Sequence, residues 1–521
     1  MSLKRNYFLT SSLLLFTAII SCSVMLDGCK SKGNNTYTLT GDTIADGKNL
    51  IQLHCTKCHA LVPVNSITKD VWKFHTLPSM AHYFGITPYL DGYFKKDKDT
   101  TTKASDSMTL LEWQSITTYY QKLAPDTLAA AKPPVQAVND WAGFSLKTPS
   151  PVSNIAYTTM AVLNPFSHKI YTSDGVAKTL TAWDSNLQME KAVVLPSPAV
   201  NASFIKDAAG NNQGLFSCIG QLQPIDFPSG KVISIDLNSK APVQTVFASE
   251  LARPVQTLTA DFNKDGLADW VVCGQGRLKG GVYLFKQNKD HTYTQSNITE
   301  QPGAVQAVAG DFNHDGWPDL MVLFGSVDEG LWMYLNDHKG GFTAKNLLRF
   351  PPVYGSTSFQ LADIDHDGNP DLIYTCGYNF HDSRILKPYH GMYIFKNTGN
   401  WNFKQQWFYP VNGCTKAIAA DFDGDGDLDI ITSAFFADLK NNPAESCIYF
   451  EQDIPFSFKP HTIPVSKYGR WFSMDVGDYN NDGKPDVILA NYAAGFNIQN
   501  GLTPFWAKSL PFVVLQNNFK K

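Results

Sequence analysis

The chain has 521 residues, of which 43% are hydrophobic and 17% charged, and its formal net charge is −4. This length suits several domains or one large closed ring of strands, and the hydrophobic fraction is sufficient for a packed core. The weakly acidic balance argues against nucleic-acid binding, which needs a basic surface. Aromatic residues at 13%, together with 37 Gly and 29 Pro, favour a protein rich in strands and turns.

The N-terminus has the pattern of an export signal. Lys4 and Arg5 form a positive region, and an uncharged, mostly apolar stretch follows over 7–20. We expect a signal peptide over 1–22. An ordinary cleaved signal and an uncleaved anchor helix are the alternatives. No later stretch is long and apolar enough to predict a membrane span.

The end of this stretch, Ile19-Ile20-Ser21-Cys22, resembles a bacterial lipobox. In proteins of that class the cysteine becomes the lipidated first residue of the mature chain, so the resemblance implies lipidation of Cys22. Cys29 is the alternative. A polar linker is expected over 23–40, and the lipid would place the protein in the cell envelope, facing the periplasm or the cell surface.

A cysteine pair with a following histidine comes next, in the run Cys55-Thr56-Lys57-Cys58-His59 at the end of a predicted helix over 46–54. Two thiols three residues apart can add to the two vinyl groups of haem, and the adjacent imidazole can then bind the iron. A redox dithiol or half of a zinc site would also use two such cysteines. The histidine, the export signal and the lack of a second such pair favour one covalent haem c.

The segment 41–127 is predicted to be a small all-α domain around this motif. Apolar positions at helical spacing predict a helix over 109–120, with Thr109 as N-cap and Glu112 three residues later. A first helix, the haem motif, a ligand-bearing loop and a closing aromatic helix resemble class I cytochrome c. The resemblance implies an electron-transfer domain.

The sixth iron ligand is expected to be Met80, which follows a proline in the loop region, as distal methionines do in that family. Thioether ligation would raise the reduction potential. His75, His82 and Met108 are rival ligands, and Met80 could instead be a core methionine. Met80 also lies farther from the last helix than is usual in the family.

The remainder of the chain carries five copies of an acidic loop, about 50 to 58 residues apart, which indicates propeller blades or another repeat array. Positions 1, 3, 5 and 9 of each loop offer side-chain oxygen atoms, and position 6 is glycine. These oxygen-bearing residues are Asp261, Asn263, Asp265 and Asp269; Asp311, Asn313, Asp315 and Asp319; Asp363, Asp365, Asp367 and Asp371; Asp421, Asp423, Asp425 and Asp429; and Asp478, Asn480, Asp482 and Asp486.

Oxygen ligands at this spacing suit calcium, and the glycine permits the sharp turn. Position 12 lacks the glutamate of an EF-hand. The loops resemble the calcium loops of FG-GAP and VCBS repeats, the blades of integrin-type propellers, which implies up to five calcium ions. A single loop of this composition could be only a turn; five in the same phase argue against that reading.

Each acidic loop is flanked by short apolar segments that predict four strands per repeat. Two copies without the acidic set precede the five, over 156–195 and 201–247, so we expect an all-β propeller of seven four-stranded antiparallel blades over 142–521. A linker is expected over 128–141. The last repeat lacks its fourth strand, and residues 142–149 are predicted to supply it and to close the ring.

The five cysteines outside the signal and the haem motif are expected to differ in role. Cys218, Cys273 and Cys376 recur at similar places in successive repeats, which favours small buried side chains. Cys414 and Cys447 lie in one repeat and are candidates for a disulfide in an exported protein.

The combined pattern is similar to exported bacterial proteins that join a cytochrome c domain to a calcium-loop propeller. It implies a haem c electron-transfer lipoprotein, whose propeller is a docking scaffold for a redox partner protein or a ligand. An oxidoreductase and a glycan-binding or adhesion propeller are the alternatives, the carrier being preferred over a substrate-converting enzyme. Long inserts over 377–391, 434–446 and 492–508 carry aromatic residues and are expected to share one face.

Overall fold

The computed structural model describes residues 37–89, 93–96, 108–152, 154–206, 210–223, 225–239, 242–380, 385–496, 499 and 501–520. The predicted signal peptide, including Cys22 and Cys29, lies outside these ranges. Among the helices within them, none is both long enough and apolar enough to cross a membrane.

The first part of the described chain is helical. Helix α2 (Thr43–His54) begins after Asp42, whose carboxylate accepts the backbone N–H groups of Ile44 and Ala45, so it starts before the predicted 46–54. Helix α5 (Leu110–Leu123) has the expected capping box between Thr109 and Glu112. Between them lie η1 (Cys55–Lys57), α3 (Lys69–Val71), η2 (Trp72–Thr76), α4 (Leu77–Ala81), η3 (His82–Phe84), β1 (Ile86–Tyr89) and β2 (Tyr93–Lys96).

Helices α2 and α5 cross in close contact at Gly47. A Cβ atom at this position would lie 2.4 Å from the Ser115 carbonyl oxygen and 2.7 Å from the Tyr119 Cβ, so only glycine allows the two backbones to approach this closely. Next to the crossing, Trp72 stacks on Tyr120 with ring centroids 3.7 Å apart. The helical part therefore has its own packed core.

The rest of the described chain forms seven sheets of antiparallel strands in chain order. Blades 1 and 2 comprise β5 (Thr158–Asn164), β6 (Lys169–Asp174), β7 (Thr179–Trp183), β8 (Met189–Val194), β9 (Ala199–Lys206), β10 (Asn212–Cys218), β11 (Gly230–Asp236) and β12 (Gln244–Leu251). Blades 3 and 4 comprise β13 (Pro254–Ala260), β14 (Asp269–Gly274), β15 (Gly281–Gln287), β16 (Tyr293–Thr299), β17 (Ala304–Gly310), β18 (Asp319–Phe324), β19 (Gly330–Asn336) and β20 (Phe342–Arg349).

Blades 5 to 7 follow the same plan, with additions from the N-terminal side of the ring. Blades 5 and 6 comprise β21 (Ser356–Ala362), β22 (Asp371–Cys376), β23 (Gly391–Asn397), β24 (Phe403–Pro410), β25 (Cys414–Ala420), β26 (Asp429–Ala434), β27 (Cys447–Ile454) and β28 (Ser457–Thr462). Blade 7 comprises β29 (Trp471–Gly477), β30 (Asp486–Asn491), β31 (Phe512–Asn517) and β4 (Phe144–Lys147). The predicted seven-bladed propeller of four-stranded antiparallel blades is confirmed.

The second strand of each acidic repeat is buried along its whole length, as in β14, β18 and β26. Both faces of such a strand are covered, so its apolar residues form a continuous run rather than an alternating one. The short apolar segment after each acidic loop is therefore the sequence signal of the blade core.

The ring is closed by chain segments from opposite ends of the propeller. Strand β4 pairs antiparallel with β31, so the fourth strand of blade 7 lies inside the expected range 142–149. Strand β3 (Val138–Asn139), within the predicted linker 128–141, adds a parallel fifth strand to blade 6 by pairing with β28. Part of this linker is thus bound to the propeller rather than free.

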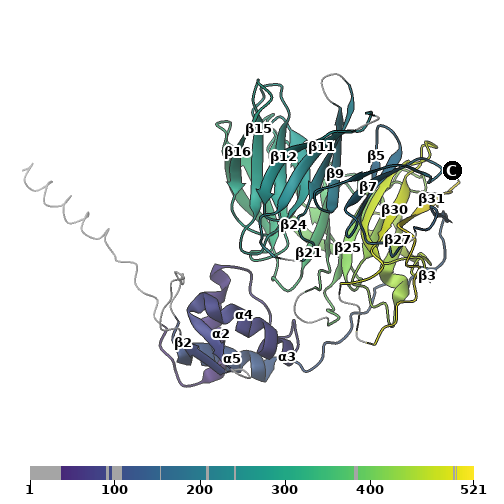
Figure 1. Cartoon of the computed structure of the whole chain (residues 1–521). Helices are drawn as coiled ribbons and strands as arrows, with labels where there is room; N and C mark the ends of the chain where they lie inside the picture. Colours follow the sequence, from purple (N-terminus) through teal and green to yellow (C-terminus); the bar gives the residue numbers. More distant parts are fainter. Residues whose placement is uncertain are drawn as a thin grey trace, which may run out of the picture.

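The helical part contacts the propeller at blades 4 and 5. Figure 1 shows the helices on the side of the propeller where β21 and β24 lie. The Tyr389 hydroxyl, from the insert between β22 and β23, donates a hydrogen bond to the Ser66 carbonyl oxygen at 3.1 Å. Val353 and Ile385 pack against the helical core.

Candidate functional site

The cysteine pair lies where the first helix ends. Helix α2 ends at His54, and the 3₁₀ turn η1 continues directly from Cys55. The two thiols and His59 are therefore presented from one continuous turn, the arrangement that attachment to haem requires. Cys55 is half-buried against the helical core, whereas Cys58 is exposed. Burial and, to a smaller extent, the neighbouring Cys58 thiol raise the pKa of Cys55 to about 12.

His59 is half-buried, and burial lowers its pKa, which keeps the imidazole neutral. Its Nδ1 lies 2.8 Å from the Ala60 carbonyl oxygen. Because a carbonyl only accepts, Nδ1 carries the proton and Nε2 is left with a lone pair. A carbonyl partner on one ring nitrogen commonly orients a histidine that binds a metal through the other. The donor set thus fits a haem iron.

The four candidates for the sixth ligand occupy different environments. Met80 is half-buried against the same core cluster as Cys55. It lies in the short helix α4 rather than in a loop, so the expected loop conformation at this position is wrong. Proline at the start of α4 is compatible with a helix because the first turn has no partner for its N–H. His75 and His82 are exposed, and Met108 is fully buried.

The acidic loops connect the first and second strands of blades 3 to 7. In the first of them, Asp261 accepts the backbone N–H groups of Asp265 and Gly266 at 3.2 and 2.9 Å. The loops that begin at Asp311, Asp363 and Asp478 repeat this pattern. The glycine at position 6 has positive φ in all five loops, between 82° and 102°. This conformation explains the glycine.

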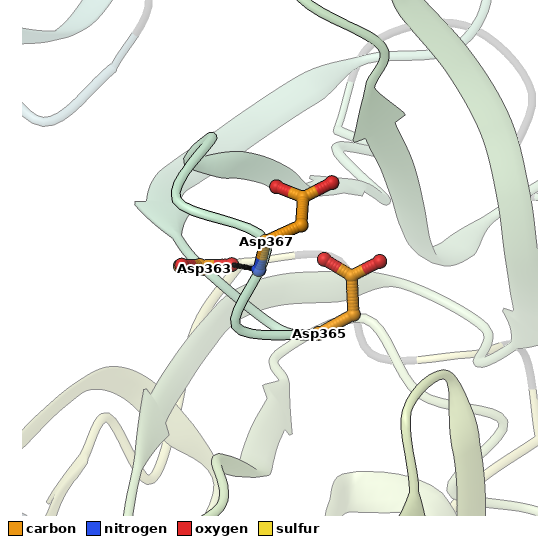
Figure 2. Close-up of side chains that lie close together, drawn as sticks. All are labelled: Asp363, Asp365 and Asp367. Carbon is orange, nitrogen blue, oxygen red and sulfur yellow. Dashed lines mark hydrogen bonds between the residues drawn. The ribbon is translucent and has the colours of Figure 1, made fainter.

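Three of the loops bring carboxylates within reach of one ion. The clusters, in which ligand oxygens lie within 4.8 Å of one another, are Asp363, Asp365 and Asp367; Asp421, Asp423 and Asp425; and Asp478, Asp482 and Asp486. Figure 2 shows the first cluster at its turn between two strands. Asn occupies position 3 in the loops of blades 3, 4 and 7, where it offers an amide oxygen instead.

The loops of blades 5 and 6 differ in how their negative charge is balanced. In blade 5 the Lys396 ammonium pairs with Asp365 and with Asp367, the latter at 3.0 Å. In blade 6, burial and the neighbouring carboxylates raise the pKa of Asp423 and raise that of Asp427 to about 6. Unbalanced carboxylates favour a bound cation, so the blade 6 loop is a better candidate for calcium than the blade 5 loop.

The aspartate at position 9 has a second role that the sequence did not reveal. In all five loops this aspartate is fully buried. One of its carboxylate oxygens accepts the backbone N–H of position 2 of the same loop, and the other accepts a backbone N–H from the third strand of the blade. These aspartates are Asp269, Asp319, Asp371, Asp429 and Asp486. The third-strand partner is distant in sequence, so spacing alone could not identify it.

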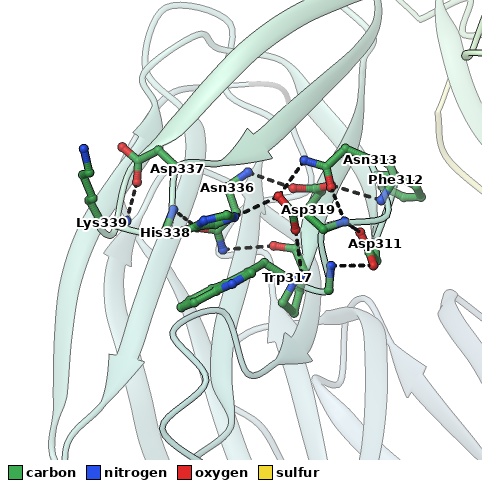
Figure 3. Close-up of polar contacts among 12 residues, drawn as sticks. Asp311, Phe312, Asn313, Trp317, Asp319, Asn336, Asp337, His338 and Lys339 are labelled. Atoms are coloured by element: carbon green, nitrogen blue, oxygen red, sulfur yellow. Dashed lines mark hydrogen bonds and ion pairs between the residues drawn. The ribbon is translucent and has the colours of Figure 1, made fainter.

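Figure 3 shows this arrangement in blade 4. A small cavity lies beside it. Asp319 accepts the backbone N–H of Asn336 at 2.8 Å. The cavity, about 260 Å³ in volume, lies between blades 3 and 4 and is lined by Trp317 and His338 among others. His338 Nε2 lies 2.8 Å from the Asp315 carboxylate, and its ring stacks on Trp317. The Asp315 carboxylate of the blade 4 loop therefore already has the His338 side chain as a polar partner.

Calcium binding and the structural role of position 9 can be tested separately in the blade 6 loop. Asp429 accepts hydrogen bonds from Phe422 N, Gln452 N and the Tyr449 hydroxyl. Asp429→Ala leaves three buried donors without partners, which is expected to cost about 3 kcal/mol or more of unfolding free energy. Denaturant unfolding in chelator measures this loss without bound calcium.

Asp425→Ala is the matched control because Asp425 is exposed in the same loop. It is expected to change the unfolding free energy in chelator by less than about 1 kcal/mol. It should nevertheless weaken calcium binding, measured by calorimetry. Equal losses of stability in the two variants would contradict the structural role of position 9.

Aromatic residues from the three long inserts meet on one face, as the sequence predicted. Ring centroids lie 5.9 Å apart for Tyr378 and Phe436, 5.5 Å for Phe380 and Phe496, and 6.4 Å for Phe435 and Phe496. His381, from the same set, lies outside the described residues. We call Tyr378, Phe380, Phe435, Phe436, Phe472, Tyr492 and Phe496 the aromatic face.

A buried arginine organises this face. The Arg470 guanidinium lies 3.8 Å from the centroid of the Phe435 ring and donates hydrogen bonds to the carbonyl oxygens of Phe435, Gly495 and Phe496. Arg470 is 2% exposed. Its side chain therefore fixes two of the inserts relative to each other.

The cysteines of the propeller are free thiols. Cys218, Cys273 and Cys376 are buried, as expected from their places in the repeats. Cys414 and Cys447 are also buried and unpaired, so the suggested disulfide between them is wrong. Each begins a different strand of blade 6, and these strands are separated by β26.

Several repeats of the chain match known repeat families. A model of the FG-GAP-like repeat matches residues 261–322, 312–374 and 385–432, and a model of the FG-GAP repeat matches 470–502. A solved streptogramin B lyase structure is 12% identical, with a TM-score of 0.45, over 72% of this chain and 98% of that one. Sqt1 of Saccharomyces cerevisiae is 12% identical, with a TM-score of 0.42, over 71% and 98%. The chain thus forms a seven-bladed β-propeller, and its segments 261–374, 385–432 and 470–502 match models of FG-GAP repeats.

Proposed function

We propose that the protein is an exported haem c electron-transfer lipoprotein whose propeller is a calcium-binding scaffold. The observation that carries the proposal is the run from Cys55 to His59 on one turn after α2, with the lone pair of His59 Nε2 left for a metal. Cys55 and Cys58 would hold the haem covalently, and His59 and Met80 would bind its iron. The bound haem would supply one-electron transfer.

The envelope location rests on the N-terminal pattern. Lipidation at Cys22, with Cys29 as the alternative, would anchor the protein in the cell envelope, facing the periplasm or the cell surface. Up to five calcium ions in the acidic loops would stabilise the turns between the first and second strands. We expect blade 6 to fill before blade 5, because its carboxylates lack the internal cation of blade 5.

Purification from the native envelope tests this function. The haem spectrum of the purified protein shows whether haem is present, and mass spectrometry identifies proteins that accompany it. Fast reduction or oxidation by a co-purified redox protein, with no response to small substrates, is the expected result. Reduction by a small substrate in the absence of any protein partner would contradict a simple carrier role.

The sixth ligand has its own test. Met80→Ala is expected to abolish the weak far-red absorption band of methionine-ligated ferric haem, because the thioether is lost. Met108→Leu tests the rival methionine, which is fully buried in the helical core, and is expected to keep the band. An unchanged band in the Met80 variant would exclude Met80 as ligand.

A second candidate function is supported by the aromatic face. Aromatic side chains held by a buried arginine form a surface on which a ring-shaped ligand can stack. This favours an oxidoreductase that binds a substrate on the propeller, or a glycan-binding propeller. Reduction of the haem by a screened substrate, lost in Phe496→Ala, would favour the oxidoreductase.

A further inference from the structure

Two neighbouring loops of blades 2 and 3 expose a group of large apolar side chains. Ile225 and Phe227, in the loop between β10 and β11, are 44% and 63% exposed. Leu278, in the loop between β14 and β15, is 72% exposed. Single apolar residues are common on a protein surface, whereas a group of them marks a contact with a partner or a membrane. We call Ile225, Phe227, Arg277, Leu278 and Lys279 the apolar tip.

Hydrogen bonds join the two loops of the apolar tip into one unit. The Asp226 carboxylate, in the first loop, accepts the backbone N–H groups of three consecutive residues of the second loop, 277–279. Asp226 directly precedes Phe227. These bonds therefore hold the backbones that carry Phe227 and Leu278 beside each other.

A buried arginine fixes the first loop from the propeller side. Arg253 is buried, and its Nη1 donates hydrogen bonds of 2.6 to 3.2 Å to the carbonyl oxygens of residues 221–223. These residues lie just before Ile225 in the chain. The exposed apolar side chains are therefore carried by a loop that is tied to the propeller at both Arg253 and Asp226.

Basic side chains flank the apolar ones. Arg277 and Lys279 are exposed on either side of Leu278 in the chain. Together with Arg253 they bring three positive charges to the two loops, in which Asp226 is the one acidic residue. Exposed apolar side chains with cations beside them fit the surface of an anionic bilayer. The apolar groups enter the acyl boundary of such a bilayer, and the cations contact its headgroups.

The apolar tip lies on the same face of the propeller as the helical part. Neighbouring strands of a blade are antiparallel, so the loops between second and third strands and the connections between blades lie at one end of the ring. Val353, between β20 and β21, and Ile385, between β22 and β23, pack on the helical core from this end. The apolar tip remains exposed beside the docked helices.

The N-terminal part of the chain favours a membrane as the partner. Tyr37, the first described residue, belongs to the helical part, because its hydroxyl donates a hydrogen bond of 2.8 Å to Asp46 in α2. Cys22, the proposed site of lipidation, lies fifteen residues earlier, so an extended tether spans up to about 50 Å. A lipid at Cys22 therefore keeps this face of the propeller close to a bilayer. The choice of partner rests on the proposed envelope location.

We propose that the apolar tip is a membrane-docking site of the propeller. Phe227 and Leu278 enter the interface of an anionic bilayer with Ile225 beside them, and Arg277 and Lys279 contact its phosphate headgroups. Docking of this kind orients the whole protein. The face that carries the helical part turns toward the bilayer, and the acidic loops, at the other end of the ring, turn away from it.

Binding of the unlipidated mature chain to vesicles tests this site. Residues 23–521 are exported behind an ordinary cleavable signal and carry Cys29→Ser, so neither candidate cysteine receives a lipid. Flotation measures the affinity of the chain for vesicles of phosphatidylcholine alone and for vesicles that also contain phosphatidylglycerol. The wild-type chain is expected to bind both, and to bind the anionic vesicles more tightly.

Two sets of variants separate the apolar from the ionic contribution. Phe227→Asp/Leu278→Asp is expected to weaken binding to both kinds of vesicle by about tenfold or more, because two apolar side chains no longer enter the interface. Arg277→Gln/Lys279→Gln is expected to weaken binding to the anionic vesicles by roughly tenfold and to leave binding to the neutral vesicles unchanged.

Ile454→Asp is the matched control for Phe227→Asp. Ile454 is also 63% exposed, but it ends β27 on the face with the acidic loops. It is expected to bind vesicles like the wild type. Equal losses in these two variants would overturn the docking site, as would a wild-type chain that binds neither kind of vesicle. A dimer in sedimentation velocity that Phe227→Asp/Leu278→Asp dissociates would also overturn it, because a second copy would then cover the tip.

The native protein separates this inference from the function on which it rests. If the native protein is lipidated and fractionates with membranes, while the unlipidated chain ignores vesicles, the docking site is overturned and the envelope location stands. A native protein without lipid overturns the proposed anchor, whereas loss of vesicle binding in the tip variants still supports the docking site.

Discussion

Deletion of residues 142–149 is expected to lower the melting temperature of the propeller by roughly 10 °C or more. Strand β4 supplies the outermost strand of blade 7, and without it β31 becomes an open sheet edge. The deletion also removes Phe144, which is 5% exposed and contacts the rings of Phe422, Tyr449 and Phe519. The deletion therefore removes both the closing strand and the buried Phe144 side chain that packs beside it.

The substitution Phe144→Ala isolates the packing part of this effect. Truncation of a buried phenylalanine costs about 3–5 kcal/mol. Ser145→Ala is the matched control on the same strand, since Ser145 is only half-buried and its hydroxyl contacts the exposed Asn518 amide. Differential scanning calorimetry in calcium compares the three variants. A deletion variant that melts like the wild type would contradict closure by this strand.

The double substitution Cys55→Ser/Cys58→Ser is expected to abolish covalent haem attachment. Serine hydroxyls do not form the thioether bonds that thiols make with the haem vinyl groups. The variants are expressed in a host that matures c-type cytochromes. Haem staining of a denaturing gel then measures the loss of covalently bound haem. Either single variant retains one thiol and is expected to give a reduced yield of haem-bearing protein.

Cys218→Ala is the control for this pair. Cys218 is a fully buried thiol of blade 2 and lies outside the helical domain. Its variant is expected to keep full haem staining. A double variant of Cys55 and Cys58 that still stains would mean that haem is bound elsewhere.

The architecture of the propeller could be predicted because its signals are local. The acidic loops recur with a blade-sized period, and each is followed by a short apolar run that becomes a fully buried strand. The glycine at position 6 was expected from turn chemistry, and its positive φ agrees. The closing strand could be inferred because the last repeat lacked a fourth strand and residues 142–149 resembled one.

Features that depend on contacts between distant residues could not be predicted. The bond from Gln452 N to Asp429 joins two different strands of a blade, and the Lys396 ammonium reaches the Asp365 carboxylate from a third strand. The Tyr389–Ser66 bond joins two domains. The spacing of residues in the sequence does not indicate these contacts. The structural role of position 9 and the contact between the helical part and the propeller could therefore not be predicted.

Two local expectations were wrong for physical reasons. The pairing of Cys414 with Cys447 was suggested by their presence in one repeat, but they lie in strands separated by β26. Met80 was expected in a loop from the resemblance to class I cytochrome c, but it lies in α4, whose first turn contains Pro78. Gly47 was not singled out, although the contact of α2 with α5 requires it.

The central claim is that one haem is bound covalently through Cys55 and Cys58. The most direct measurement is the haem content of the purified wild-type protein after acid extraction, read by the alkaline pyridine spectrum and by intact mass. We predict that one haem per chain remains with the polypeptide and gives the spectrum of a c-type haem. A polypeptide mass without haem, or haem that is removed by the extraction, would contradict the claim.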